Sequence, residues 1–138
     1  MFYTNYQSEK SDDINGNPRV SMLFFWPGLQ RQVRIQGFVT KISPEESDRY
    51  FNSRPRSSQL GAWASDQSRP LKSRETLEQK LKDLEKKFPK HIDRPEFWGG
   101  YGIAPFKFEF WQGRPSRLHD RIVFEKEENS WVSHRINP

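Results

Sequence analysis

The sequence contains no cysteine among its 138 residues, which excludes disulfide bonds, thiolate metal ligands and cysteine nucleophiles. It also lacks any apolar run that approaches the roughly 20 residues of a membrane-spanning helix. The first residues, MFYTN, carry neither the basic nor the apolar segment of a secretory signal peptide. These absences predict a soluble, cytoplasmic protein with no membrane partner.

Several common catalytic motifs are missing as well. There is no Gly-x-Gly-x-x-Gly or P-loop sequence for a nucleotide phosphate, and no Gly-x-Ser-x-Gly turn for a serine hydrolase. The three histidines, His91, His119 and His134, lie far apart and lack the spacing of metal ligands. We therefore expect no metal site and none of these enzyme classes.

The length fits one domain, and we expect residues 1–138 to form a single domain. Leu, Ile, Val and Phe account for only 31 residues, so the 11 Phe, 5 Trp and 4 Tyr must supply much of the core. The net charge of +5 has three interpretations: an ordinary mixed surface, a patch for nucleic acid or acidic membrane, or arginines that converge on a small phosphorylated ligand. The motifs below favour the third, so we expect no nucleic-acid partner.

Hydrophobic periodicity predicts a mostly antiparallel sheet with a few helices, of the β-barrel or α+β class. The clearest helix start is a capping box formed by Ser43 and Glu46, with Pro44 at the first helical position. Residues 90–100 are predicted to form a loop. The expected strands are 19–25, 32–41, 106–111, 118–124 and 131–136, and the expected helices are a short one within 8–17, then 43–53, 57–64 and 73–88.

The helix over 73–88 carries one narrow apolar stripe, formed by Leu77, Leu81, Leu84 and Phe88. A basic amphipathic helix can bind a membrane surface or a partner. The mixed charges around this stripe favour instead a solvated outer helix of a globular domain.

The densest polar motif is Arg117-Leu118-His119-Asp120-Arg121. On a strand, side chains alternate, so Arg117, His119 and Arg121 would share one face and repel one another unless an anion lies opposite. A histidine there could also move a proton near neutral pH. The alternative is a solvated strand face that Asp120 and nearby acids neutralise.

A second group combines Tyr50, Arg54 and Ser58 at intervals of four residues around a helix end. A phenol, a guanidinium, a hydroxyl and a helix N-terminus together suit a phosphate. The alternative is a capped helix-turn-helix with a surface arginine. Lys10, Gln32 and the pair Gln67-Ser68 specify no ligand by themselves.

Several strings nevertheless resemble one family over essentially the whole chain. Residues 50–62, YFNSRPRSSQLGA, look like the central signature of the pyridoxamine 5′-phosphate oxidases. Residues 98–101 and 109–113, WGGY and EFWQG, resemble later blocks of that family, and residues 117–121, RLHDR, resemble its C-terminal signature. Residues 2–5, FYTN, resemble the end of its FMN-contacting strand.

This resemblance implies a mainly β fold with helices, an FMN-binding split β-barrel that is incomplete at the N-terminus. It implies a homodimer with FMN between the subunits, and oxidation of pyridoxamine or pyridoxine 5′-phosphate to pyridoxal 5′-phosphate with O2 as acceptor. The protein would position the two rings while the flavin supplies the chemistry.

The resemblance also assigns roles to individual residues. Tyr50, Arg54 and Ser58 are expected to hold the substrate phosphate, and Arg117 and His119 to act as catalytic, substrate-binding residues over the pyridine ring. The positions that match FMN-contacting residues of the family are Tyr3, Thr4, Lys10, Gln32, Gln67, Ser68, Trp111 and Arg121.

Two departures from the family pattern affect these expectations. Glu9 stands where the family usually has an arginine, which should weaken FMN binding if its side chain points inward. The chain also begins after the family's N-terminal region, which carries further FMN contacts. Three interpretations remain open: a truncated product, a chain complemented by a separate polypeptide, or a remnant that folds alone and binds flavin or pyridoxal phosphate without catalysis. A related flavin oxidase acting on another ring, as in phenazine biosynthesis, is disfavoured by the phosphate residues.

Overall fold

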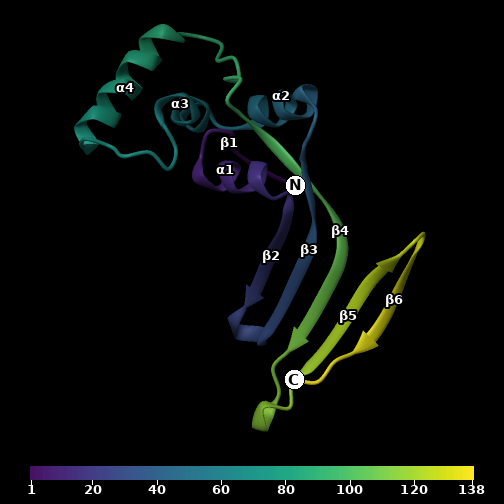
Figure 1. Ribbon diagram of the computed structural model, residues 1–138. Coiled ribbons are helices and arrows are strands. Elements are labelled where there is room, and N and C mark those ends of the chain that lie inside the picture. The colour runs from purple at the N-terminus through teal and green to yellow at the C-terminus, as the bar shows by residue number, and fades with distance from the viewer. The chain divides into compact units, whose positions relative to one another are not determined.

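The computed structural model describes all residues 1–138, which divide into two compact units. Unit 1 comprises residues 1–16 and 40–102, and unit 2 comprises residues 17–39 and 103–138. That residues 1–138 form a single domain stays a prediction. The elements in chain order are β1 (Phe2–Asn5), α1 (Glu9–Gly16), β2 (Arg19–Trp26), β3 (Arg31–Lys41), α2 (Pro44–Ser53), α3 (Arg56–Ala64), α4 (Arg74–Lys87), β4 (Trp98–Gln112), β5 (Asp120–Glu127) and β6 (Ser130–Arg135) (Figure 1).

Unit 1 holds the four helices and a short antiparallel pair. Strand β1 pairs with the start of β4, with Phe2 opposite Tyr101 and Asn5 opposite Trp98. Glycine at position 100 allows close packing at the start of β4, because a Cβ there would overlap the side chains of Ile42 and Tyr3.

The core of unit 1 lies between helices α2 and α3 and the start of β4. Its buried members are Phe51, Leu60, Ala62, Ile92 and Trp98. The apolar stripe of α4 packs against this core through Leu81, Leu84 and Phe88, so α4 is an outer helix of unit 1.

The predicted capping of α2 is confirmed, because the Ser43 hydroxyl accepts a hydrogen bond from the Glu46 backbone N–H at 3.2 Å. Helix α4 begins in the same way at Ser73, whose side chain accepts from Thr76 N–H at 3.3 Å. None of the four α-helices has both the length and the apolar character needed to cross a bilayer.

Unit 2 is a sheet in which the strand order is β2-β3-β4-β5-β6. Short turns join some neighbouring strands: a 3₁₀ turn over Pro27–Leu29 follows β2, and the β5–β6 hairpin turns at Glu128 and Asn129. Strands β3 and β4 are instead connected through α2, α3 and α4. The result is an open sheet-rich fold with helices, which confirms the predicted fold class.

Two sequence predictions about strands were wrong at their boundaries. Strand β4 begins at Trp98 rather than at Phe106, because the glycines that suggested a loop allow the close pairing with β1. Strand β5 begins only at Asp120. The residues before it form a 3₁₀ turn over Pro115–Arg117, in which Ser116 and Arg117 have left-handed φ angles of 57° and 61°.

Candidate functional site

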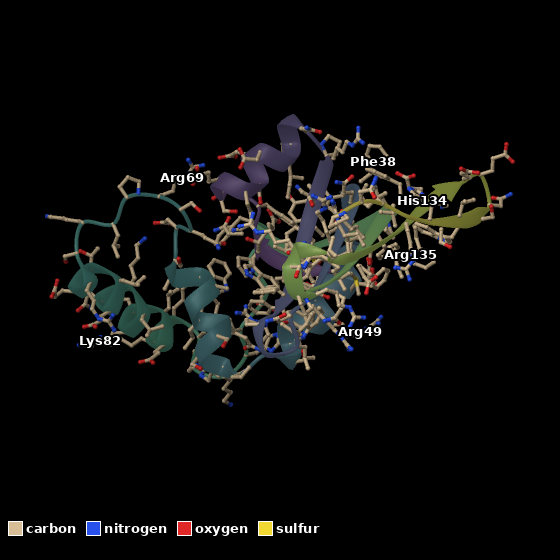
Figure 2. The ribbon with its side chains drawn as sticks, turned by 90° about the horizontal axis from the view of Figure 1, so that it is seen from below. Phe38, Arg49, Arg69, Lys82, His134 and Arg135 are labelled. Atoms are coloured by element: carbon tan, nitrogen blue, oxygen red, sulfur yellow. The ribbon has the colours of Figure 1, made fainter.

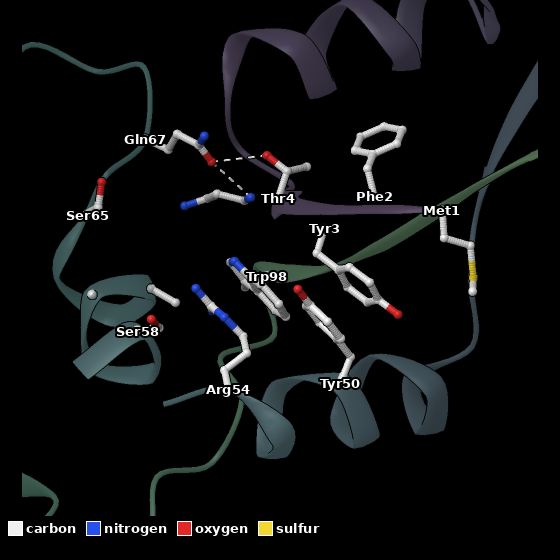
Figure 3. Close-up of a pocket in the computed structure, with 13 residues that line it drawn as sticks. Met1, Phe2, Tyr3, Thr4, Tyr50, Arg54, Ser58, Ser65, Gln67 and Trp98 are labelled. Atoms are coloured by element: carbon white, nitrogen blue, oxygen red, sulfur yellow. Dashed lines mark hydrogen bonds between the residues drawn. The ribbon is translucent and has the colours of Figure 1, made fainter. Parts of the chain in front are cut away.

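A cleft of about 700 Å³ opens in unit 1 between β1, the end of α2 and the start of α3 (Figure 3). We call it the Arg54 cleft. Small residues of α3 and the aromatic side chains of α2 and β4 form its walls. Its lining residues are Met1, Phe2, Tyr3, Thr4, Asn5, Tyr50, Arg54, Ser58, Gly61, Ala62, Ser65, Gln67 and Trp98.

Arg54 lies between the two helices that shape the cleft. Pro55 keeps the Arg54 backbone extended, at φ −77° and ψ 150°, so α2 ends before Arg54. The Arg54 side chain then turns toward the cleft (Figure 3). The guanidinium lies over the Trp98 ring, 4.6 Å from its centroid. Its Nη1 atom is buried and has no hydrogen-bond partner.

Arg54 is therefore a cation without an acid. It takes part in none of the ten ion pairs of the structure. Burial lowers the pKa of the Arg54 guanidinium from its ordinary value, because removal from water disfavours the charged form. An anion in the cleft would supply the missing partner.

Tyr50 and Ser58 flank Arg54 from the two helices. The Tyr50 ring stacks on Tyr3, with centroids 3.7 Å apart, and lies parallel to Trp98 at 6.2 Å. Ser58 comes from the first turn of α3, and Figure 3 shows it across the cleft from Tyr50. The structure thus brings together the three residues that the spacing predicted, and their role as phosphate ligands stays a prediction.

A polar network lies at the β1 side of the same cleft. The Thr4 hydroxyl donates to Gln67 Oε1 at 3.1 Å, and the Asn5 backbone N–H donates to the same oxygen at 3.1 Å. Lys10 Nζ donates to the Thr4 hydroxyl at 3.0 Å and takes part in no ion pair. Ser68, which was expected beside them, is exposed, has a left-handed φ of 67° and does not line the cleft.

The other predicted site residues belong to unit 2, where three of them share one face of the sheet. Trp111 on β4 is directly opposite Arg121 on β5. Gln32 and Arg34 are two residues apart on β3, so their side chains lie on the same face of that strand. Arg34 and Arg121 both bind Glu109. We call this group the Glu109 face: Gln32, Arg34, Glu109, Trp111 and Arg121.

Sequence reasoning missed Glu109 and Arg34. Glu109 is only 3% exposed and lies at the centre of the face. Burial alone would raise the pKa of Glu109, but hydrogen bonds and charge from Arg121 and Arg34 outweigh it and lower that pKa. The alternation in residues 106–111 did place an acid between aromatic residues, which was the available signal.

Arg117 and His119 do not share a strand face with Arg121, so that prediction was wrong. Arg117 lies in the left-handed 3₁₀ turn, is exposed and forms no ion pair. His119 precedes β5, stacks on Trp111 with centroids 4.8 Å apart, and accepts a hydrogen bond at Nδ1 from the Arg114 backbone N–H at 3.1 Å.

Asp120 neutralises two other arginines of this region. Its carboxylate accepts from Arg114 Nε and Arg135 Nη1, both at 2.8 Å, and Figure 2 shows Arg135 on β6. The alternative interpretation, a strand face whose charges are neutralised by nearby acids, therefore holds for Arg121, which pairs with Glu109. It does not hold for Arg117.

Two protein-family models match this chain, one over each part of it. A family model described as "Pyridoxamine 5'-phosphate oxidase" matches residues 1–88. A second model, described as "Pyridoxine 5'-phosphate oxidase C-terminal dimerisation region", matches residues 98–138.

Curated relatives named "Pyridoxine/pyridoxamine 5'-phosphate oxidase" match over the full chain. The protein from Rhodopirellula baltica is 54% identical, and that from Cytophaga hutchinsonii is 56% identical. The alignments cover 100% of this chain but only 64% and 66% of those relatives, so the chain spans about two thirds of their length.

Among solved structures, PhzG from Burkholderia lata, determined in complex with tetrahydrophenazine-1-carboxylic acid, superposes with a TM-score of 0.92 at 28% identity. The match covers 99% of this chain and 67% of that one. A pyridoxamine 5′-phosphate oxidase-related, FMN-binding protein from Nostoc punctiforme shares the fold, with a TM-score of 0.77 at 19% identity over 99% of this chain and 72% of that one.

The architecture is thus that of the split-barrel oxidases, with a sheet that is not closed in this chain. Family models match both parts of the chain, and relatives more than 50% identical align over all of it. The chain belongs to the pyridoxine/pyridoxamine 5′-phosphate oxidase family, which is a family of enzymes.

Proposed function

We propose that the chain binds FMN and a pyridoxine-type 5′-phosphate. It catalyses the oxidation of pyridoxamine or pyridoxine 5′-phosphate to pyridoxal 5′-phosphate, with O2 as the electron acceptor. The observation that carries this proposal is the unpaired, partly buried guanidinium of Arg54 in a cleft that also presents a phenol and a hydroxyl. The names of the relatives support the reaction.

The Arg54 cleft suits a phosphate monoester. The Arg54 guanidinium offers charge and a free donor, while Tyr50 and Ser58 offer hydroxyl donors. Because Trp98 covers one side of the guanidinium and excludes water, its bonds to a phosphate are stronger than bonds in bulk solvent.

The donor sets of both units fit FMN. In unit 1, Lys10, Thr4 and Gln67 form a hydrogen-bonded group whose ammonium has no acid partner, which suits an anionic cofactor. In unit 2, Gln32, Trp111 and Arg121 share the Glu109 face. Bound at these residues, FMN would supply the redox chemistry, as a hydride acceptor that O2 can reoxidise.

Arg117 and His119 would orient the substrate ring. Since His119 Nδ1 accepts from the Arg114 backbone N–H, the neutral imidazole holds its proton on Nε2. That leaves Nε2–H as a donor toward the substrate. Arg117, which has no acid partner, would add a second donor.

We also infer a homodimer of a single split-barrel domain, because residues 98–138 match a family segment described as a dimerisation region. Sedimentation equilibrium of the 138-residue chain tests the dimer. A monomer mass at concentrations where FMN saturates would overturn it.

The proposed function is tested by FMN titration of the chain, followed by an assay for peroxide and aldehyde with pyridoxamine 5′-phosphate. Saturable flavin binding with turnover supports an oxidase. Flavin binding with no turnover would support the alternative of a non-enzymatic binding protein. Oxidation of an unphosphorylated ring in preference to the phosphorylated one would favour the activity suggested by the PhzG likeness.

A further inference from the structure

The carboxylate of Glu109 is a buried charge in unit 2. It is the one charged side chain among the buried polar residues of the protein, which are Thr4, Asn5, Ser8, Ser11, Ser47 and Glu109. It lies on β4, the central strand of the unit 2 sheet. A buried charge of this kind is costly unless it is paired and fully hydrogen-bonded.

Glu109 divides its two oxygens between two strands. Oε1 accepts a hydrogen bond from Arg121 Nε at 2.8 Å and lies 2.7 Å from Arg121 Nη2 in the ion pair. Oε2 accepts from Arg34 Nη2. The carboxylate therefore binds β5 on one side and β3 on the other, through the two arginines that flank it.

These contacts fix the Arg121 guanidinium in one orientation. Two of its nitrogens bind Glu109, and the third, Nη1, donates to the Asn137 backbone carbonyl at 3.1 Å. Arg34, in contrast, has a side chain that is 39% exposed and a buried Nε with no partner. Of the two arginines, Arg121 is the one held rigidly, directly opposite Trp111.

We propose that Glu109 is a positioning residue for the cofactor: it holds Arg121 in a fixed orientation beside Trp111 so that the guanidinium meets the anionic flavin nucleotide without reorganising. The inference rests on the proposed FMN function. A preorganised guanidinium loses little conformational freedom on binding, which is how a residue that does not touch a ligand can raise its affinity.

This role makes a prediction opposite in sign to that of charge alone. Removing the negative charge of Glu109 leaves the face more positive, which by long-range attraction would strengthen binding of an anion at low salt. If Glu109 acts by positioning, removal instead weakens binding, because Arg121 becomes mobile. The sign of the change therefore separates the two explanations.

The test uses Glu109→Gln, with Glu125→Gln as its matched control. Glu125 lies on the same face of the same sheet and pairs with Lys107 at 2.8 Å, and it does not contact Arg121. Both variants remove one negative charge. We expect Glu109→Gln to raise the FMN dissociation constant about tenfold, the scale of one charge-assisted hydrogen bond. We expect Glu125→Gln to change it less than twofold.

A double-mutant cycle shows whether the effect passes through Arg121. In an Arg121→Met background, Glu109→Gln should cause no further loss of FMN affinity, because the group that it positions is gone. Additive losses in the two variants would mean a general structural role and would overturn the proposal. Thermal unfolding of each variant is measured in parallel.

Arg34→Met keeps the proposal testable if Glu109→Gln does not fold. This variant leaves the bond between Glu109 and Arg121 intact, so FMN affinity should stay within twofold of the wild-type value. A tenfold loss of FMN affinity would show that the whole group of Arg34, Glu109 and Arg121 matters, and not the orientation of Arg121 alone.

The outcomes separate the two proposals. If the wild-type chain binds no FMN, the proposed function falls, and the cofactor role of Glu109 falls with it. If the wild-type chain binds FMN and Glu109→Gln binds it equally or more tightly, only the positioning role is overturned.

Discussion

Arginine is used in two different ways in the two units. In unit 1, Arg54 lies over Trp98 with a buried nitrogen that has no partner. In unit 2, Arg34 and Arg121 share the buried carboxylate of Glu109. An unpaired arginine in a cleft is available to a ligand, whereas an arginine paired with a buried carboxylate serves first to fix geometry.

The difference also divides stability from function. A paired buried carboxylate contributes to folding because its loss leaves two cations facing each other. An unpaired, partly desolvated cation has no acid partner in the folded chain and is available to a ligand. Variants of Arg54 should therefore change ligand binding without a loss of stability, whereas variants of Glu109 should also lower the free energy of unfolding.

The largest expected effect is on stability, from Glu109→Ala. Deleting this carboxylate removes the partner of both Arg34 and Arg121, and breaking a buried pair in this way costs about 3 kcal/mol in the free energy of unfolding. Urea unfolding followed by circular dichroism measures it. The surface variant Glu78→Ala is the control, because Glu78 pairs with the exposed Arg74. If both variants lower the free energy of unfolding by a similar amount, the buried pair is no stronger than a surface pair.

The second prediction concerns Arg54→Met, which should leave the free energy of unfolding unchanged or raise it. It should weaken binding of pyridoxal 5′-phosphate by about 100-fold, the scale of losing one or two charge-assisted hydrogen bonds. Isothermal titration measures the affinity.

The matched control for that variant is Arg49→Met on α2, the helix that ends just before Arg54, because Arg49 is exposed (Figure 2) and does not line the Arg54 cleft. Equal losses in the two variants would place the phosphate elsewhere.

Lys10→Met should have a smaller effect, about fivefold on FMN affinity, because the ammonium is exposed and water competes for it. The hydroxyl of Thr4 keeps its bond to Gln67 without the lysine. Quenching of flavin fluorescence measures the change. Lys82→Met on α4 is the control, since Lys82 is an exposed lysine outside the cleft (Figure 2).

The smallest effect is one of pH. Because the arginines lower the pKa of Glu109 below its ordinary value of 4.5, its contribution to stability is present above pH 4.5 and is lost as pH falls through the folded-state pKa. The free energy of unfolding should therefore fall more steeply below pH 4.5 in the wild type than in Glu109→Gln. If the free energy of unfolding falls with the same slope in both proteins, the pKa of Glu109 is not lowered in the folded state.

Local signals in the sequence predicted most of the elements. The capping box at Ser43 and the stripe of α4 depend on neighbours three or four residues apart, so they can be read without the fold. Tyr50, Arg54 and Ser58 were found for the same reason, because one proline-interrupted helix pair carries them all.

Long-range pairing explains what the sequence analysis missed. The start of β4 is a strand only because β1 pairs with it, and the two glycines there suggested a loop. Glu109 meets Arg34 across a separation of 75 residues, which no local pattern reports. Arg117 was misplaced because two left-handed residues after Pro115 delay the start of β5.

The buried Nη1 atom of Arg54 has a consequence for how the protein responds to heat. The folded chain gives up hydration at this atom and recovers nothing for it until an anion binds. Any anion that occupies the cleft binds the native state alone, so it raises the melting temperature by an amount set by its concentration relative to its dissociation constant. The melting temperature of the wild-type chain then ranks phosphate-bearing compounds by their fit to the cleft, with no need for turnover.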